Sequence, residues 1–111
     1  MRIVKLKSNY EFKRAYKKGT PLVGRFIIIY VFKNKKDYNR LGITVSRKLG
    51  CAVKRNRVRR LISESYRLSM GAHRQGYDFV IVGRTRALTA KMDDVLLCMN
   101  ELLKKNGLLT A

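Results

Sequence analysis

The stretch Phe26-Ile-Ile-Ile-Tyr-Val-Phe32 indicates a β-sheet more strongly than any other part of the sequence. This run of β-branched and aromatic residues is too short for a buried helix, and it is typical of a strand that is covered on both faces. Successive side chains of a strand point to opposite faces, so Phe26, Tyr30 and Phe32 share one face. We therefore expect one face of the sheet to be rich in aromatic side chains.

Patterns on either side of this strand predict helices. Ser8 and Glu11 fit a capping box, and the apolar spacing after them predicts a short helix over residues 9–18. Apolar residues recur at helical spacing over residues 51–70 and again from residue 92 to about residue 106. We expect three amphipathic helices that each bury one face.

Further strands complete the fold. Residues 41–45 alternate in polarity after a polar loop at 33–39, so we expect them to form a hairpin with residues 26–32. Residues 77–82 form another strand, and one more short strand remains unplaced. The order is α-β-β-(β)-α-β-α. It predicts an α/β (α+β) two-layer sandwich, with a mixed sheet of about four strands and three helices, as one domain over residues 1–111.

The charge balance points to a polyanionic partner. The 111 residues include 26 Lys and Arg against 7 Asp and Glu, which gives a formal net charge of +19. Nucleic acid is the commonest polyanion that relieves such self-repulsion, and a membrane surface is the second candidate. No apolar run is long enough for a spanning helix, and the first residues lack a signal-peptide segment. We expect a cytoplasmic protein with no membrane partner.

Residue types that carry catalysis are sparse and scattered. Cys51 and Cys98 match no metal-ligand spacing, so we expect free thiols in a reducing compartment. The single histidine, His73, is expected to be an exposed loop residue without a role. Asp93 and Asp94 are adjacent acids, but the first turn of a helix favours carboxylates whatever the function. The sequence predicts no protein catalytic site, and no phosphate-cradling glycine motif is present.

Residues 46–60, the basic segment, carry the functional signal. They include seven Lys and Arg and no acid, and they lead into the predicted second helix. Uncompensated like charges are costly for folding, so their presence suggests that a polyanion normally neutralises them. A helix N-terminus adds backbone N–H groups and a positive dipole end, which suit phosphate oxygens.

The same segment resembles the signature of the bacterial ribonuclease P protein family. The pattern Gly-x-x-Val-Ser-x-Lys-x-Gly-x-Ala-Val covers residues 42–53, and Arg-Asn-Arg and Arg-Arg follow at 55–57 and 59–60. An N-terminal helix, an apolar strand, a later strand and a last helix extend the resemblance over nearly the whole chain. Two small departures are Tyr16, where the family often has Phe, and Cys51, where it often has Asn.

The resemblance implies a ribosomal-protein-S5-like sandwich that serves as the protein subunit of an RNA enzyme. In such a complex the RNA removes the 5′ leader of precursor tRNA by metal-dependent hydrolysis, with magnesium ions in the RNA–protein complex and no cofactor bound by the protein alone. The implied partners are the ribonuclease P RNA and the precursor tRNA leader, without an obligate protein partner.

The resemblance also implies the site residues. A leader cleft would contain Phe12, Tyr16 and Tyr30, although Phe12 has equally the spacing of a packing residue. Asn56 adds no charge, so it would act by directed hydrogen bonds or by orienting a hydrated metal ion, unless it only starts the helix. The implied RNA-binding residues are Arg47, Lys48, Lys54, Arg55, Asn56, Arg57, Arg59, Arg60 and Arg67.

Other functions fit the sequence less well. A ribosomal protein would share the charge, size and mixed fold, and only the signature separates it from the ribonuclease P reading. An autonomous nuclease would need a denser set of histidines and acids than this chain has. A sequence-specific DNA binder would need base-reading residues on its exposed helix, whereas the arginines here are of the phosphate-binding kind.

Overall fold

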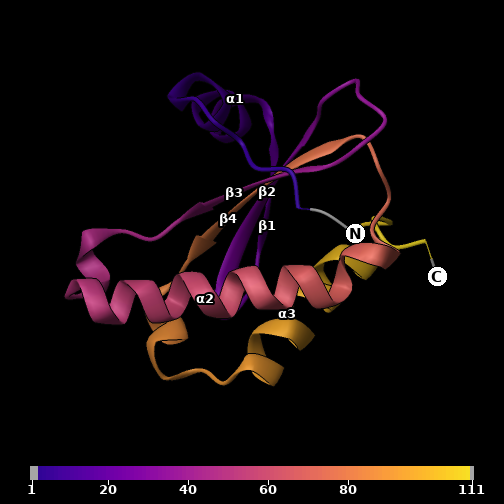
Figure 1. The fold of residues 1–111 in the computed structure, drawn as a ribbon. Helices are drawn as coiled ribbons and strands as arrows, with labels where there is room; N and C mark the ends of the chain where they lie inside the picture. Colours follow the sequence, from indigo (N-terminus) through magenta and orange to yellow (C-terminus); the bar gives the residue numbers. More distant parts are fainter. Residues whose placement is uncertain (1–2, 111) are drawn as a thin grey trace.

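The computed structural model describes residues 3–110 and contains one four-stranded sheet and three α-helices (Figure 1). Short 3-10 turns follow β3 (η1, Arg47–Leu49), α2 (η2, Met70–Ala72) and β4 (η3, Thr85–Thr89). The elements are α1 (Asn9–Lys18), β1 (Thr20–Val23), β2 (Ile27–Lys33), β3 (Arg40–Thr44), α2 (Ala52–Ser69), β4 (Tyr77–Gly83) and α3 (Met92–Lys105). The predicted fold class and element order are confirmed, and β1 is the short strand that the sequence did not place.

The strand order corrects one prediction. The sheet runs β1-β2-β4-β3, with β2 antiparallel to β1 and β4 and with β3 parallel to β4. The expected hairpin between residues 26–32 and 41–45 is therefore wrong, because β4 lies between these strands. Most of β4 is buried, which places it in the centre of the sheet, and β2 instead forms its hairpin with β1.

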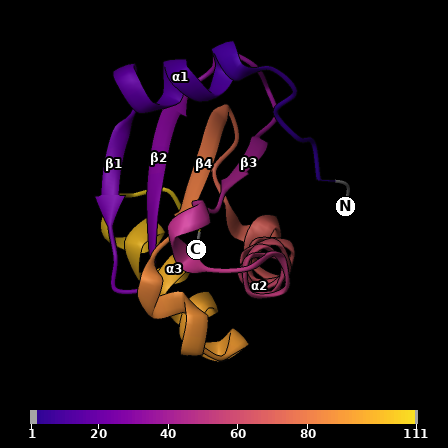
Figure 2. The ribbon, with the colours of Figure 1, turned by 90° about the vertical axis from the view of Figure 1, so that its left-hand side faces the viewer.

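The main core lies between the sheet and the two longer helices. Figure 2 shows α2 and α3 on one side of the sheet and α1 across the end of the strands on the other side. Ile27 and Ile29 of β2 and Ile81 of β4 face α2 and α3, where they pack with Ile62 and Met99. The burial of these large apolar side chains between the sheet and the two helices is the main contribution to the stability of the fold.

The opposite sheet face is only partly covered. Under α1, Val80 is fully buried in a smaller cluster with Ala15. Beyond α1, Ile28 and Val82 are half-buried and Val23 is 63% exposed. The expectation that β2 is covered on both faces therefore holds for one face and for only part of the other, because α1 is too short to cross the whole sheet.

The helix predictions are confirmed closely. Ser8 and Glu11 form the predicted capping box, and α1 has the predicted bounds. The α3 helix ends where expected, with Gly107 at a φ of 72°, a left-handed conformation that favours glycine. The two cysteines are free thiols in the structure. No helix in residues 3–110 is long and apolar enough to cross a membrane.

His73 corrects a second prediction. It was expected to be exposed, but its side chain is 2% exposed and stacks edge-on against Tyr66 and Phe79. Its Nε2 atom lies 2.8 Å from the Ser69 hydroxyl oxygen. After the η2 turn, His73 forms an isolated β-bridge with Leu109, and its ring is buried against Tyr66 and Phe79. Burial lowers the pKa of His73 to about 4, so the ring is neutral at neutral pH.

Candidate nucleic-acid interface

The basic segment is held in place by a small number of anchoring contacts. The Ser46 hydroxyl accepts a hydrogen bond from the Lys48 N–H and begins the η1 turn. Leu49 is buried in the main core, so the turn is fixed to the sheet while its charged residues point outward. Gly50 follows at a φ of 123°, which an L side chain rarely adopts. This glycine lets the chain reverse into α2.

The N-terminus of α2 is open toward an anion. The N-cap residue is Cys51, whose side chain makes no capping hydrogen bond within the described part of the chain. The first backbone hydrogen bond of the helix runs from the Arg55 N–H to the Cys51 carbonyl, so earlier N–H groups are available. The backbone N–H groups of Lys54 and Val53, with the Lys54 charge, lower the pKa of the Cys51 thiol. The site therefore favours negative charge.

The predicted RNA-binding residues line the outer surface of η1 and α2, where most of them are exposed. Arg55 is half-buried, and its Nε atom has no hydrogen-bond partner among residues 3–110. Arg67 forms an exposed ion pair with Glu64. The structure leaves the following residues exposed: Arg47, Lys48, Lys54, Asn56, Arg57, Arg59, Arg60 and Arg67.

Arg57 differs from the other members of this set. Its guanidinium donates to the carbonyl oxygens of Leu88 and Ala90, at 3.0 and 2.7 Å, and more weakly to that of Ala87. These carbonyls lie in and just after η3, so Arg57 ties the start of α2 to the connection between β4 and α3. We infer that a large part of its role is structural.

Asn56 is exposed beside Arg59. Its side-chain oxygen accepts a long hydrogen bond of 3.4 Å from the Arg59 guanidinium. A cation at this oxygen disfavours a second, metallic cation there. Within residues 3–110 the side chains of His, Cys, Asp and Glu form no group of three that could hold a metal ion. A role of Asn56 in orienting a hydrated metal ion stays a prediction.

Two of the three predicted cleft residues meet on the uncovered sheet face. The rings of Tyr16 on α1 and Tyr30 on β2 lie edge to face with centroids 5.0 Å apart. The Tyr16 hydroxyl forms a short hydrogen bond with the Thr44 hydroxyl on β3, and Tyr16 is 37% exposed. We call the surface formed by Tyr16, Tyr30 and Thr44 the tyrosine face. It combines aromatic rings, on which bases can stack, with hydroxyls at a wet edge.

Phe12 occupies a different place. Its ring lies over Gly42 of β3, where a Cβ atom would come within 2.6 Å of the ring, and it packs against Leu6. Gly42 is thus needed for the close approach of α1 to the sheet. Of the two roles that the sequence left open for Phe12, packing is evident in the structure, and a contact with the leader stays a prediction.

Sequence reasoning missed the ion-pair network that positions α1. Asp78 of β4 is fully buried, and its carboxylate accepts hydrogen bonds from Arg40 at 2.8 Å and from Arg14 at 3.3 Å. Arg40 also pairs with Glu11. We call these four residues the charged junction. The available signal was an acid inside an otherwise apolar strand, which is costly to bury unless it is paired.

The charged junction perturbs the titration of Glu11 and Arg40. Backbone N–H groups of Lys7 and Ser8, together with the Arg40 charge, lower the pKa of Glu11 to about 2. Hydrogen bonds that Arg40 donates to the Asp78 carboxylate raise the pKa of Arg40 above its usual range. Glu11 and Arg40 are therefore charged at neutral pH.

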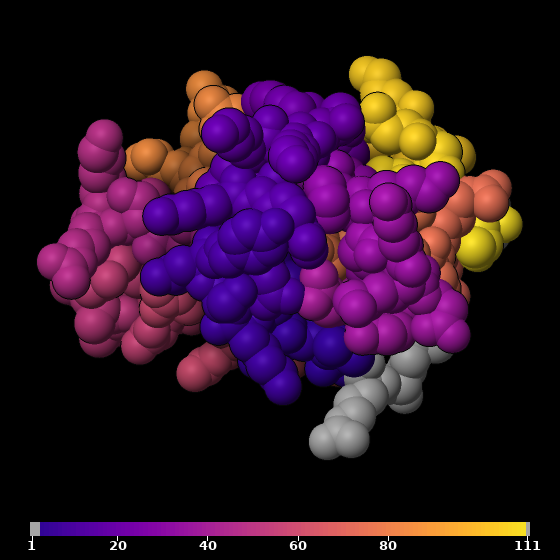
Figure 3. Space-filling model, turned by 90° about the horizontal axis from the view of Figure 1, so that it is seen from above, coloured from indigo at the N-terminus to yellow at the C-terminus, as the bar shows by residue number. Residues whose placement is uncertain are grey.

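Figure 3 shows the molecule from the side of α1, which crosses the middle of this view between the start of α2 and the loop that precedes β3. The basic segment and the charged junction thus flank the partly covered sheet face. This arrangement places the exposed residues of the basic segment next to the aromatic rings of the tyrosine face.

Comparison with known proteins agrees with this geometry. The Ribonuclease P family profile matches residues 1–107. The chain is 43% identical over 106 residues to the ribonuclease P protein component of Clostridium acetobutylicum, covering 94% of this chain and 89% of the relative. It is 40% identical to that of Clostridioides difficile, covering 93% of this chain and 91% of the relative.

Solved structures show the same fold. The RNase P protein of Staphylococcus aureus superimposes with a TM-score of 0.85 at 31% identity, covering 97% of this chain and 99% of the other. The RNase P protein of Thermotoga maritima gives 0.83 at 30% identity, covering 91% and 96%. Matches of this extent in sequence and structure show that the chain belongs to the ribonuclease P protein family.

Proposed function

We propose that this protein, a ribonuclease P protein component of tRNA processing, binds the catalytic RNA and the 5′ leader of precursor tRNA. The basic segment contacts phosphates of the RNA subunit, and the tyrosine face holds the single-stranded leader. Binding at both surfaces promotes endonucleolytic hydrolysis that releases the leader and gives the mature tRNA 5′ end.

The observation that carries this proposal is the contrast between compensated and uncompensated charge. Glu11 and Asp78 both form ion pairs with arginines of the charged junction. The basic segment contains no acid, and it opens α2 with free backbone N–H groups. A surface of this kind gains affinity by releasing counterions from phosphates, and this gain does not depend on base sequence. Stacking on the tyrosine face does not depend on base sequence either, and this tolerance suits a protein that meets many different leaders.

We assign the hydrolytic chemistry to the RNA subunit. Magnesium ions in the RNA–protein complex supply charge neutralisation and water activation for phosphodiester hydrolysis. The protein's own residues neutralise backbone phosphates and orient the leader by stacking on Tyr16 and Tyr30. We place this activity in the cytoplasm, without a membrane partner or an obligate protein partner.

Cleavage of precursor tRNA at low magnesium concentration tests the proposal. The substrate is incubated with the protein alone, with a bacterial ribonuclease P RNA alone, and with both. We expect cleavage mainly in the mixture, because the protein strengthens substrate binding when few magnesium ions screen the phosphates. Cleavage by the protein alone would identify an autonomous nuclease, and a mixture no faster than the RNA alone would favour a ribosomal-type RNA binder.

A further inference from the structure

A pocket lies at the end of α2, away from the basic segment. Its volume is about 470 Å³, and it is formed by the N-terminal segment, the loop before β3, and the end of α2 with the turn after it. The helix α2 has 18 residues, so its end lies about 25 Å from its start (Figure 1). We call this site the helix-end pocket. Its lining includes Val4, Tyr38, Tyr66, Met70, His73 and Gln75.

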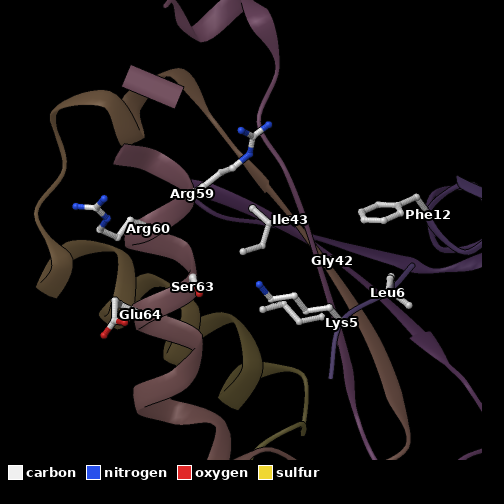
Figure 4. Close-up of a pocket in the computed structure, with 10 residues that line it drawn as sticks. Lys5, Leu6, Phe12, Gly42, Ile43, Arg59, Arg60, Ser63 and Glu64 are labelled. Carbon is white, nitrogen blue, oxygen red and sulfur yellow. The ribbon is translucent and has the colours of Figure 1, made fainter. Parts of the chain in front are cut away.

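The helix-end pocket has no charged lining residue, although the protein carries a formal net charge of +19. The groove in Figure 4 differs, because Lys5, Arg59 and Arg60 are among the residues that line it. Three further grooves of the described chain also include charged side chains. Burying a charge without a partner is costly, so we expect an uncharged occupant in the helix-end pocket.

His73 keeps one ring nitrogen without a hydrogen-bond partner. The Ser69 hydroxyl donates to the Ser65 carbonyl at 3.1 Å, and a hydroxyl has only one proton to donate. It therefore accepts from the Nε2–H of His73, 2.8 Å away. The Nδ1 atom is then an acceptor, and it meets no donor among residues 3–110. A buried acceptor of this kind is costly unless a bound group donates to it.

Tyr66 supplies a second polar group to the same pocket. The residue is 2% exposed, and its hydroxyl forms no hydrogen bond with residues 3–110. Burial raises the pKa of Tyr66 to about 12, so the hydroxyl keeps its proton and can donate it. The Tyr66 ring meets the His73 ring edge to face, with centroids 5.0 Å apart. One unused donor and one unused acceptor thus belong to neighbouring rings.

The rest of the lining favours a flat ring. Tyr38 presents a second aromatic ring beside Tyr66, and Met70 adds a flexible thioether that packs well against aromatic groups. The Gln75 amide is already used, because its oxygen accepts from a backbone N–H of the loop before β3 and its nitrogen donates to the His73 carbonyl. The unused groups of Tyr66 and His73 are therefore the specific contacts that the pocket offers.

We propose that the helix-end pocket binds a small uncharged planar molecule that carries an amide-type donor and acceptor. An N–H of the ligand donates to His73 Nδ1, and its carbonyl accepts from the Tyr66 hydroxyl. Met70 moves aside to admit the ring, since its side chain has three rotatable bonds. Aromatic amides and free nucleobases share this chemistry. The proposal goes beyond the RNA-binding function and does not depend on it.

Two other occupants fit the pocket less well. A hydrocarbon chain would leave both polar groups without partners, which is costly in a buried site. Ordered water would donate to His73 Nδ1, but it would gain nothing from the aromatic lining. A planar ring with an amide group uses both features.

An NMR titration of the free protein tests the proposal. His73 is the single histidine of the chain, so its imidazole signals identify the site directly. Benzamide and benzoate are matched probes that share a ring and differ in charge, and uracil represents the free nucleobases. At neutral pH, benzamide or uracil should shift the His73 signals to saturation. Benzoate should bind there at least about tenfold more weakly than benzamide, because its charge would be buried without a partner.

A pair of tyrosine variants separates a hydrogen bond from packing. Tyr66→Phe removes the proposed donor and keeps the ring, so it should weaken the binding of the uncharged probe about three- to tenfold, the effect of one neutral hydrogen bond. Tyr77→Phe removes a hydroxyl outside the pocket and should leave the affinity unchanged. Urea unfolding checks that both variants fold.

The titration of the wild type does not depend on the folding of any variant. If neither benzamide nor uracil shifts the His73 signals, the pocket holds only solvent and the proposal fails. Equal binding of benzoate, or an unchanged affinity in folded Tyr66→Phe, would also overturn it. The experiment contains no RNA, so a negative result leaves the proposed RNA-binding function untouched.

Discussion

The charged junction and the basic segment use arginine in opposite ways. At the junction, Arg14 and Arg40 meet two carboxylates, one of which is fully buried, and their contacts fix α1 on the sheet. In the basic segment, positive residues follow one another without an acid, and apart from Arg55, which is half-buried, and Arg57, which binds backbone carbonyls, they are exposed and form no ion pair with an acid among residues 3–110. The difference is that the junction's charges are paired within the protein and stabilise its fold, whereas the basic segment has no acid of its own, and we propose that RNA phosphates neutralise it.

The largest expected effect lies at the junction. Asp78→Ala leaves two arginines without their buried partner, so it should lower the free energy of unfolding by about 3–5 kcal/mol. Urea denaturation followed by circular dichroism measures this change. The matched control is Asp37→Ala in the exposed loop, which should change stability by less than about 0.5 kcal/mol. Equal effects for the two variants would show that the junction does not stabilise the fold.

Acid should destabilise the fold through His73 in a defined pH window. The folded pKa of about 4 lies below the ordinary value of 6.5, so the unfolded chain binds the proton more readily. Stability is therefore full above pH 6.5 and falls, by up to about 3 kcal/mol, as the pH drops toward 4. Unfolding by urea at a series of pH values measures this slope. It should flatten in His73→Gln, and an unchanged slope would assign the window to other groups.

Glu11 should act in a separate, more acidic window. Its folded pKa of about 2 lies below the ordinary 4.5, so its stabilising contribution is full above pH 4.5 and is lost as the pH falls toward 2. Glu11→Gln should flatten the stability curve only below pH 4.5, which separates it from His73→Gln. The opposite assignment of the two windows would contradict the burial of His73.

Arg57 and Arg60 sharpen the comparison within a single helix. Arg57→Ala removes donors from backbone carbonyls after β4, so it should cost about 1–3 kcal/mol of unfolding free energy. Arg60→Ala should leave stability unchanged but weaken RNA binding and lower its logarithmic salt slope by about 0.7–0.9. If Arg60→Ala destabilised the fold as much as Arg57→Ala, the distinction between arginines that stabilise the fold and arginines that bind RNA would be wrong.

Tyr30→Ala should have a smaller and more selective effect. Loss of stacking should weaken the binding of leader-bearing precursor tRNA to the assembled complex by about 1 kcal/mol, the low end for one base, since Tyr16 remains. Mature tRNA, which has no leader, is the control ligand and should bind as before. Equal losses for both substrates would indicate a folding defect.

The elements whose patterns are local could be predicted from the sequence. Ser8 and Glu11 define α1 because a capping box requires only residues three positions apart. The position of β3 could not be predicted, because neighbours along the chain need not be neighbours in a sheet. The pairing depends on β4, which lies more than thirty residues after β3.

Within the candidate site, the exposed arginines could be predicted and the structural ones could not. The basic segment stands out by charge alone, but nothing local distinguishes Arg57 from Arg60. The distinction depends on the carbonyls of Leu88 and Ala90, about thirty residues away. His73 was misjudged for the same reason, since its burial depends on Tyr66 and Phe79 and not on its own loop.

The most direct test of the central claim is the salt dependence of binding to ribonuclease P RNA for the wild type and for the triple variant Arg55→Ala, Arg59→Ala, Arg60→Ala. Affinities are measured over a range of monovalent salt at fixed magnesium. We expect the triple variant to stay folded and its logarithmic slope to fall by about 2–3, one lost phosphate contact for each arginine. An unchanged slope in a folded variant would show that the arginines at the start of α2 do not contact RNA phosphates.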